Sequence, residues 1–225
     1  MRWAVQSGDA PLFGRERGCE EFEQRLLRFD AASEPFANEA DDEVLYVLDG
    51  RGTIEIGGET AAVEEGAAIW AAAGTTWRVA DADGLELLSV LVREPVEGDG
   101  ERYAIVGAEE SDEGAATAGR HFRLLSTPER GCASVTQFIG LIPVGKAPDH
   151  FHRYDEVIYV LDGEGELHIE GETAPLRSGT CVHLPKGLVH CLENTGDGEM
   201  RVLGVFRPAG SPAEAYYPDG TKAQY

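Results

Sequence analysis

Three histidines and one glutamate in the second half of the chain are spaced as ligands of a single metal ion. His150 and His152 lie two residues apart, Glu156 follows four residues later, and His190 comes after a Pro-Lys-Gly turn at residues 185–187. Because residues two apart on a strand point to the same side, His150 and His152 are expected to face one interior. Three imidazoles and one carboxylate suit Mn, Fe, Ni, Co or Zn. Four such ligands would leave two adjacent positions of an octahedral ion open for a substrate or dioxygen.

The scaffold around these residues occurs twice in the chain. Residues 43–50 and residues 156–163 are identical at seven of eight positions, and the match continues without a gap at a constant offset of 113 positions. In this register Gly52 falls on Gly165. Two ungapped copies that share their glycines indicate a tandem duplication.

Each copy is predicted to consist of short strands separated by glycine turns. Residues 44–48 and 157–161 are rich in β-branched and aromatic side chains, and the Asp-Gly pair that follows each of them is a strong hairpin signal. A helical pattern is weak, and residues 16–27 are the best candidate for a helix. Closely and evenly spaced strands with glycine turns predict a sandwich or a barrel.

The two halves of the ligand pattern resemble the paired motifs of the cupin superfamily. Residues 145–163 carry the glycine, two histidines, glutamate and closing glycine of the first motif, with one residue fewer between its first glycine and first histidine. Residues 179–194 carry the glycine, proline, glycine, histidine and asparagine of the second motif. The resemblance implies an all-β fold of two tandem cupin barrels, each a double-stranded β-helix or jelly roll. We place the N-terminal cupin domain at residues 1–106, a polar linker at 107–119 and the C-terminal cupin domain at 120–225.

The same resemblance implies a function for the second barrel. One divalent metal ion (Mn, Fe, Ni or Zn) would be held there by His150, His152, Glu156 and His190. The leading expectation is a dioxygenase that acts on a small organic molecule, with Glu156 as the catalytic residue that stays a ligand or detaches to take a proton. The alternatives are a non-redox decarboxylase, isomerase or hydrolase and a non-catalytic binding protein. Oxalate decarboxylases of this superfamily generally use metal in both barrels, which disfavours that alternative.

The first copy lacks the histidines. Ala37, Glu39 and Trp77 occupy the positions of the three histidines, and only the glutamate is retained, as Glu43. This set is not expected to hold a transition metal against water. The first barrel is therefore expected to be a structural partner, an apolar ligand pocket faced by Trp70 and Trp77, or a barrel that these tryptophans simply fill.

Several other residues and one segment are considered as parts of the site. His183 either lines the cavity or, as we favour, is a packed or hydrogen-bonded histidine. Tyr154 shares the parity of the ligands and either reaches the pocket or belongs to the core. His168 is expected to be exposed, and His121 has no support as a site residue. The proline- and glycine-rich segment 208–220 is expected to be a surface tail rather than a cover for a barrel mouth.

Composition limits the partners and the location of the chain. A formal charge of −22 over 225 residues argues against binding to nucleic acid or to an anionic membrane. The sequence has no run of about 18 apolar residues, as a membrane helix needs, and no signal-peptide pattern at its start. The four cysteines form no CxxC pair, so free thiols in a reducing cytoplasm are expected. The expected partner is a small-molecule substrate, and a second copy of the chain in a homodimer is a further candidate.

Overall fold

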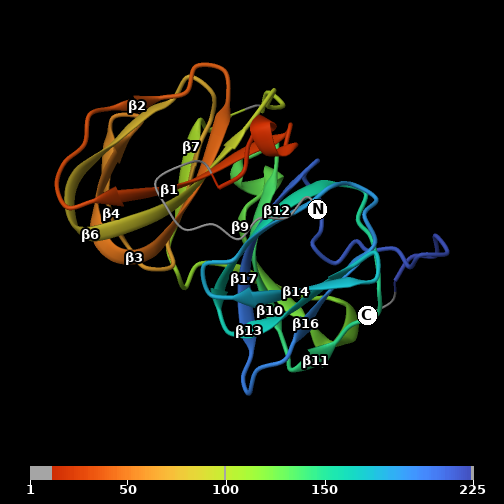
Figure 1. Ribbon diagram of the computed structural model, residues 1–225. Coiled ribbons are helices and arrows are strands. Elements are labelled where there is room, and N and C mark those ends of the chain that lie inside the picture. Colours follow the sequence, from red (N-terminus) through yellow and green to blue (C-terminus); the bar gives the residue numbers. More distant parts are fainter. Residues whose placement is uncertain (1–11, 99, 224–225) are drawn as a thin grey trace. The chain divides into compact units, whose positions relative to one another are not determined.

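A computed structural model describes residues 12–98 and 100–223 of the chain (Figure 1). Nearly all of its regular structure is β-strand, and in this part of the chain no helix is long and apolar enough to cross a membrane. The chain divides into two compact units. The N-terminal barrel comprises the described residues up to 111 together with 125–135, and the C-terminal barrel comprises 112–124 and 136–223. The predicted all-β fold of two tandem barrels is confirmed.

A single sheet forms the N-terminal barrel, in the strand order β1-β6-β3-β5-β7, with β2 paired to β6 and β4 paired to β3. The strands are β1 (Phe22–Phe29), β2 (Phe36–Ala37), β3 (Asp42–Ile56), β4 (Glu59–Glu64), β5 (Ala68–Ala71), β6 (Thr76–Val92) and β7 (Tyr103–Val106). The long strands β3 and β6 pair with each other through three shifts of register. Such bulges bend a strand pair, so that the same two strands contribute to both walls of the barrel.

Two sheets form the C-terminal barrel, in the orders β15-β12-β17-β10-β9-β8 and β11-β16-β13-β14. The strands are β8 (Asp112–Ala115), β9 (His121–Ser126), β10 (Thr136–Ile142), β11 (Gly145–Lys146), β12 (Asp155–Asp162), β13 (Glu164–Ile169), β14 (Glu172–Arg177), β15 (Cys181–Leu184), β16 (His190–Asn194) and β17 (Met200–Arg207). At the offset of 113 residues, β12 and β13 together correspond to β3, and the chain is interrupted between them at Gly163.

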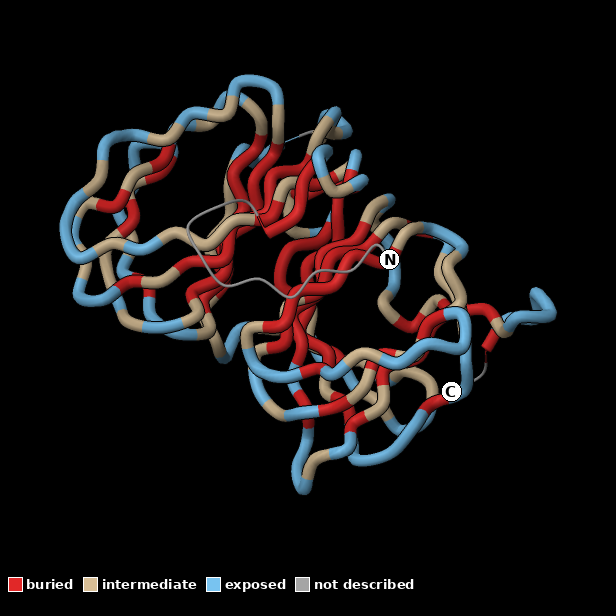
Figure 2. Tube along the Cα trace, in the orientation of Figure 1, coloured by how far each residue is buried: buried red, intermediate tan, exposed pale blue. Residues whose placement is uncertain are grey.

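The core of each barrel comes from residues that alternate along the strands. Ile54 and Ile56 are buried on β3, and Leu167 and Ile169 are buried on either side of the partly exposed His168 on β13. Figure 2 shows that buried residues follow the strands and exposed residues follow the turns. Burial of one face of each strand makes the interior apolar, so a polar side chain found there needs a separate explanation.

Residues 16–27, at best a weak candidate for a helix, form a short turn and a strand instead. Only Arg15–Arg17 form a single 3-10 turn (η1), and β1 begins at Phe22. Phe22 and Gln24 are buried at alternate positions, and β1 pairs with β6 along its whole length. Pairing with a long neighbouring strand outweighs a weak helical pattern.

The boundaries of the two units differ from the expected ones in two segments. Residues 112–119, expected to be linker, hold β8 and the 3-10 turn η2 (Thr117–Gly119), and β8 pairs with β9. Residues 125–135 include the turn η3 (Pro128–Arg130) and belong to the N-terminal barrel, where the Ser134 hydroxyl donates to Asp42 Oδ2 at 2.8 Å. Long-range pairing and side-chain hydrogen bonds set these boundaries, and composition does not reveal either.

The cysteines are structural. Cys19, Cys132, Cys181 and Cys191 are all buried, and each keeps its thiol rather than forming a disulfide, as the sequence predicted. Burial raises the pKa of Cys132 and of Cys181 to about 12, so both thiols stay protonated and pack as small apolar side chains.

Replacement of Gly165 by alanine is expected to destabilise the C-terminal barrel. A Cβ at this position would lie 2.1 Å from the Glu193 carbonyl oxygen of the paired strand. Gly52, its counterpart, has the same constraint, since a Cβ there would lie 2.6 Å from the Asp81 carbonyl oxygen. We expect Gly165→Ala to lower the free energy of unfolding by about 1–3 kcal/mol, as measured by urea denaturation. Gly198→Ala is the matched control, because a Cβ there meets no atom within 4 Å. Equal stability of the two variants would contradict this explanation of the repeated glycine.

Candidate metal centre

Backbone pairing brings two of the predicted ligands together. The amide of His150 donates to the carbonyl of His190 at 3.0 Å, and the amide of His190 donates to the carbonyl of His150 at 2.8 Å. His190 begins β16, and His152 lies two residues after His150, so its ring returns to the same side. One nitrogen atom from each of the three rings lies within 4.8 Å of the other two. Three of the four predicted ligands therefore converge on one point.

Hydrogen bonds fix the orientation and the tautomer of each ring. Nδ1 of all three imidazoles lies at hydrogen-bond distance from a backbone carbonyl oxygen. These oxygens belong to Pro148 for His150 (2.9 Å), to Glu214 for His152 (2.8 Å) and to Leu188 for His190 (2.9 Å). Because a carbonyl oxygen can only accept, Nδ1 carries the proton and donates, which leaves the lone pair of Nε2 for a metal ion.

Burial keeps the three imidazoles neutral. It lowers the pKa of His150, lowers the pKa of His152 to about 3, and lowers the pKa of His190 well below its usual value. The positive charge of the nearby Arg120 lowers the pKa of all three further. Neutral imidazole is the form that binds a metal ion, so these rings are ready to do so at neutral pH.

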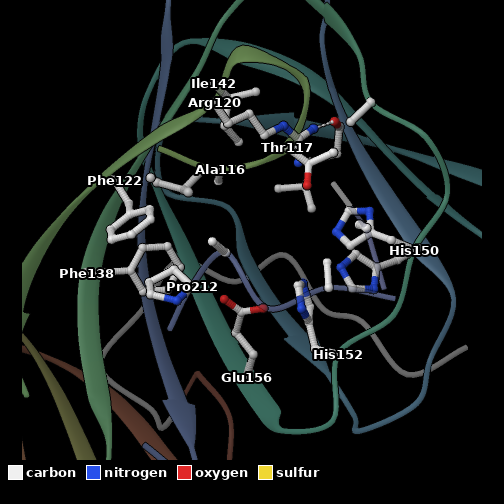
Figure 3. Close-up of a pocket in the computed structure, with 18 of the residues that line it drawn as sticks. Ala116, Thr117, Arg120, Phe122, Phe138, Ile142, His150, His152, Glu156 and Pro212 are labelled. Carbon is white, nitrogen blue, oxygen red and sulfur yellow. Dashed lines mark hydrogen bonds between the residues drawn. The ribbon is translucent and has the colours of Figure 1, made fainter. Parts of the chain in front are cut away.

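Glu156, on β12, faces the same cavity but stands outside the compact group of histidine nitrogens (Figure 3). The residue is 3% exposed, and no described residue donates a hydrogen bond to its carboxylate. Burial raises the pKa of Glu156 to about 8. A divalent cation beside the three imidazoles would offset the cost of burying this carboxylate, so the donor set fits a metal ion. The structure thus groups three of the four predicted ligands and places the fourth at the edge of the same cavity.

The cavity in front of these ligands is mostly apolar. It encloses about 770 Å³ of free space, including its open mouth. The histidines form one wall, and Phe122 and Phe138 form the wall opposite (Figure 3). The ring of Tyr154 stacks on His152 with centroids 4.6 Å apart and on Phe206 with centroids 4.0 Å apart. Tyr154 therefore both lines the cavity and belongs to the core, so the two interpretations of this residue are compatible.

Part of the wall comes from residues that sequence reasoning missed. Ala116 and Thr117 line the cavity from within the segment expected to be a linker, and Arg120 follows directly after it. His121, which the sequence did not support as a site residue, is an exposed residue at the edge of the same cavity. No local pattern marks these positions, because a single arginine beside a glycine-rich segment looks like an ordinary surface residue.

The expectation of a surface tail at residues 208–220 is wrong. Phe151 and Tyr216 exchange backbone hydrogen bonds at 2.8 and 3.0 Å, and their rings stack with centroids 5.6 Å apart. The Arg153 guanidinium lies 4.0 Å from the centre of the Tyr216 ring, on which it packs. Other residues of this C-terminal segment (residues 208–223) line the cavity: Pro212, Ala213, Ala215, Tyr217 and Ala223. The aromatic residues in a proline- and glycine-rich segment were the one signal in the sequence that it packs rather than extends into solvent.

Two further histidines of the barrel, His183 and His168, are hydrogen-bonded. His183 is buried on β15, where Nε2 lies 2.7 Å from Asp155 Oδ1, so the packed interpretation of His183 is confirmed. His168 is partly buried rather than exposed, and its Nε2 lies 2.8 Å from Glu193 Oε2. Cross-strand pairing with an acidic neighbour holds His168 against the sheet.

In the N-terminal barrel, hydrogen bonds occupy the carboxylate that corresponds to Glu156. Glu43 is fully buried and accepts from Asn38 Nδ2 at 2.6 Å, from Ser89 Oγ at 2.5 Å and from Trp77 Nε1 at 2.8 Å. The Arg25 guanidinium adds an ion pair at 3.3 Å. With four donors around it, Glu43 is neutralised and solvated by the protein itself, and it has no need of a cation.

Trp77 and Phe36 fill part of the interior of this barrel. Trp77 is 1% exposed, and Phe36 stacks on it with ring centroids 4.4 Å apart. Phe36 also pairs with Trp77 across β2 and β6. Ala37, which the repeat aligns with His150, is the next residue and is exposed. Trp70 does not share this interior, since its neighbours Ile69 and Ala71 on β5 pack with Trp77 and alternate with it. A pocket faced by both tryptophans is therefore ruled out.

Two tandem jelly-roll barrels, with converging histidines in the second, define a bicupin. The chain belongs to the cupin domain family, whose model matches residues 28–92 and 138–206. Over 94 residues it is 33% identical to polyketide synthase CurC of Streptomyces cyaneus, a match that covers 40% of this chain and 60% of that one. Over 72 residues it is 36% identical to L-ectoine synthase of Aliivibrio fischeri, with 32% and 56% covered. The chain thus matches less than two thirds of each of these relatives.

Solved structures resemble the chain over both barrels. Protein Ylba from E. coli superposes with a TM-score of 0.72 at 17% identity and covers 88% of this chain and 81% of its own. A mutant of Bacillus subtilis oxalate decarboxylase superposes with a TM-score of 0.67 at 16% identity, with 86% and 71% covered. At these identities the similarity establishes the fold alone.

We expect Glu156→Gln to change how the stability of the metal-free protein depends on pH. The pKa of Glu156 is raised from 4.5 to about 8 in the folded state, so the folded protein resists ionisation that the unfolded chain undergoes freely. The wild type should therefore lose stability relative to the variant as the pH rises from 5 to 8, by at most about 1.4 kcal/mol per pH unit. Urea unfolding in the presence of a chelator measures this difference, and the histidines, present in both proteins, serve as the internal control. If the difference in free energy of unfolding between the two proteins stays the same across this pH range, Glu156 is not a buried carboxylate without a partner.

Proposed function

We propose that the C-terminal barrel is the active site of a metal-dependent enzyme that acts on a small organic molecule, most favourably as a dioxygenase-type oxidoreductase. The observation that carries the proposal is the convergence of three neutral, oriented imidazoles next to a buried carboxylate without a partner. A site built only for packing would not need three carbonyl-anchored histidines inside an apolar cavity.

His150, His152 and His190 would hold the metal ion, with Glu156 as a fourth ligand or as a base beside it. A bound divalent transition metal would supply Lewis acidity and, if it is redox-active, a route for electrons to dioxygen. The protein contributes the surroundings: Phe122 and the apolar walls exclude water from the reacting atoms. Because no described residue donates a hydrogen bond to Glu156, its carboxylate, once ionised beside the metal ion, would be free to take a proton from a bound substrate.

The character of the cavity supports the dioxygenase form of the proposal. An apolar chamber with an open mouth admits dioxygen and a small organic molecule together and keeps reactive species away from water. The occupied carboxylate of Glu43 argues against a mechanism that needs metal in both barrels. The residues of the two copies support a metal ion in the C-terminal barrel and an interior filled by side chains in the N-terminal barrel.

A non-redox reaction is the second candidate, and Glu156 is the observation that favours it. A buried carboxylate next to a Lewis acid is suited to proton transfer in an elimination, an isomerisation or a hydrolysis. The names of the relatives CurC and L-ectoine synthase describe synthesis rather than oxygenation. A binding protein without turnover is the third possibility that the test must separate.

We expect His150→Ala and His152→Ala each to abolish stoichiometric metal binding and to weaken affinity by more than about 100-fold, because each removes an anchored ligand. Trp77→Ala should retain one metal ion per chain, since Trp77 belongs to the filled barrel. Elemental analysis of protein purified from metal-supplemented culture and competition with a chelator measure both. Metal that stays in the histidine variants, or that disappears with Trp77→Ala, would place the site elsewhere.

The reaction class is tested by turnover with and without dioxygen. A panel of catechols, flavonols and keto acids should include a compound that the metal-loaded protein converts with uptake of one dioxygen per product, measured with an oxygen electrode. Conversion that continues unchanged under anaerobic conditions would refute the dioxygenase and support the non-redox enzyme. Saturable binding of panel compounds with no conversion under either condition would support a binding protein. Glu156→Gln should lower the rate of either reaction and leave the tertiary structure intact.

A further inference from the structure

Arg120 is a feature of the cavity that the proposed reaction does not use. Its guanidinium reaches the cavity from just before β9, donates to the carbonyl oxygen of Leu192 and lies beside the Cys191 thiol. In Figure 3 it lies at the edge of the cavity opposite to Glu156. Among the described residues, no carboxylate forms an ion pair with Arg120.

The surroundings of Arg120 leave its charge without compensation. A guanidinium has five N–H donors, and a single carbonyl oxygen and a thiol use only part of them. The side chain is partly removed from water, and this burial lowers its pKa, although a guanidinium keeps its proton throughout the ordinary pH range. Burial of an unpaired charge is costly, so a group of this kind is expected to meet an anion in the functional state. The abundant acidic residues of the chain do not supply one here.

The geometry of the guanidinium indicates the kind of anion. Its planar fork matches two oxygens of a carboxylate through parallel hydrogen bonds. The rest of the cavity would not favour a strongly hydrated polyanion, since Phe122, Phe138 and Ala213 present apolar surface close by. Aromatic walls favour a flat apolar body.

We propose that the ligand of this cavity is a small carboxylate with a flat apolar body. The carboxylate is bound by Arg120, the body packs against Phe122 and Phe138, and the opposite face of the body is turned toward the histidines. This inference rests on the proposed function, because it assigns a substrate class to the same site. In this arrangement Arg120 determines specificity. The group that anchors the substrate is then a different part of the molecule from the atoms that react near the histidines.

Direct binding to the metal-free protein tests the inference without relying on turnover. Benzoate and phenylacetate are the probes, and benzamide is the neutral match of benzoate in shape. Isothermal titration calorimetry and ligand-observed NMR should show that the wild type binds benzoate at millimolar concentration, at least about 10-fold more tightly than benzamide. Arg120→Met should weaken benzoate binding by roughly 10- to 100-fold and leave benzamide unaffected. Arg120→Lys, which keeps the charge and loses the fork, should lie between the two.

Arg201→Met is the matched control, because Arg201 is exposed on β17 and does not line the cavity. It should bind benzoate as the wild type does. Equal affinity for benzoate and benzamide, unchanged benzoate affinity in Arg120→Met, or no binding of either carboxylate at millimolar concentration would each overturn the inference. If circular dichroism shows that Arg120→Met does not fold, the comparison of Arg120→Lys with wild type decides. Absence of metal binding or turnover would overturn the proposed function but not this result, because the titrations contain no metal.

Discussion

The candidate site depends on one backbone interaction, the reciprocal hydrogen-bonded pair between His150 and His190. This pair joins the segment that precedes β12 to the start of β16, and thereby sets two metal ligands side by side although they are 40 positions apart in the chain. The other contacts extend it: His152 returns to the same side two residues later, and the carbonyl oxygens of nearby residues fix the rings. Because the backbone holds the ligands in place, the site is organised before any metal arrives.

The two copies of the repeat surround the corresponding buried glutamate with different groups. Glu43 is surrounded by the side chains of Asn38, Ser89, Trp77 and Arg25, whereas Glu156 has no donor among the described residues. The tryptophan that replaces a histidine ligand turns its indole N–H to the carboxylate and so fills both the volume and the electrostatic role that a metal would have. The barrel without the histidine ligands therefore compensates its buried glutamate with a network of side-chain donors.

Much of this architecture could be predicted from local sequence patterns. The repeat, the strands with their glycine turns, and the histidines that converge all depend on residue spacing, which the sequence displays directly. Arg120, the walls contributed by Ala116 and Phe122, and the packing of residues 208–223 depend on which distant segments meet, and no local pattern encodes that. The weak helical pattern at residues 16–27 gives way for the same reason, because pairing of β1 with β6 overrides a weak local preference.

The hydrogen bond from His152 to the carbonyl oxygen of Glu214 has a consequence for biogenesis. It links a ligand of the candidate centre to a residue 62 positions further along the chain, in a segment that packs on Phe151 through Tyr216. A chain still being synthesised would contain His150, His152 and His190 before it contained this carbonyl group. Until residue 214 has emerged from the ribosome, the ring of His152 lacks the partner that selects its tautomer. The three imidazoles are therefore all oriented only after the segment around residue 214 has been synthesised and has packed on Phe151.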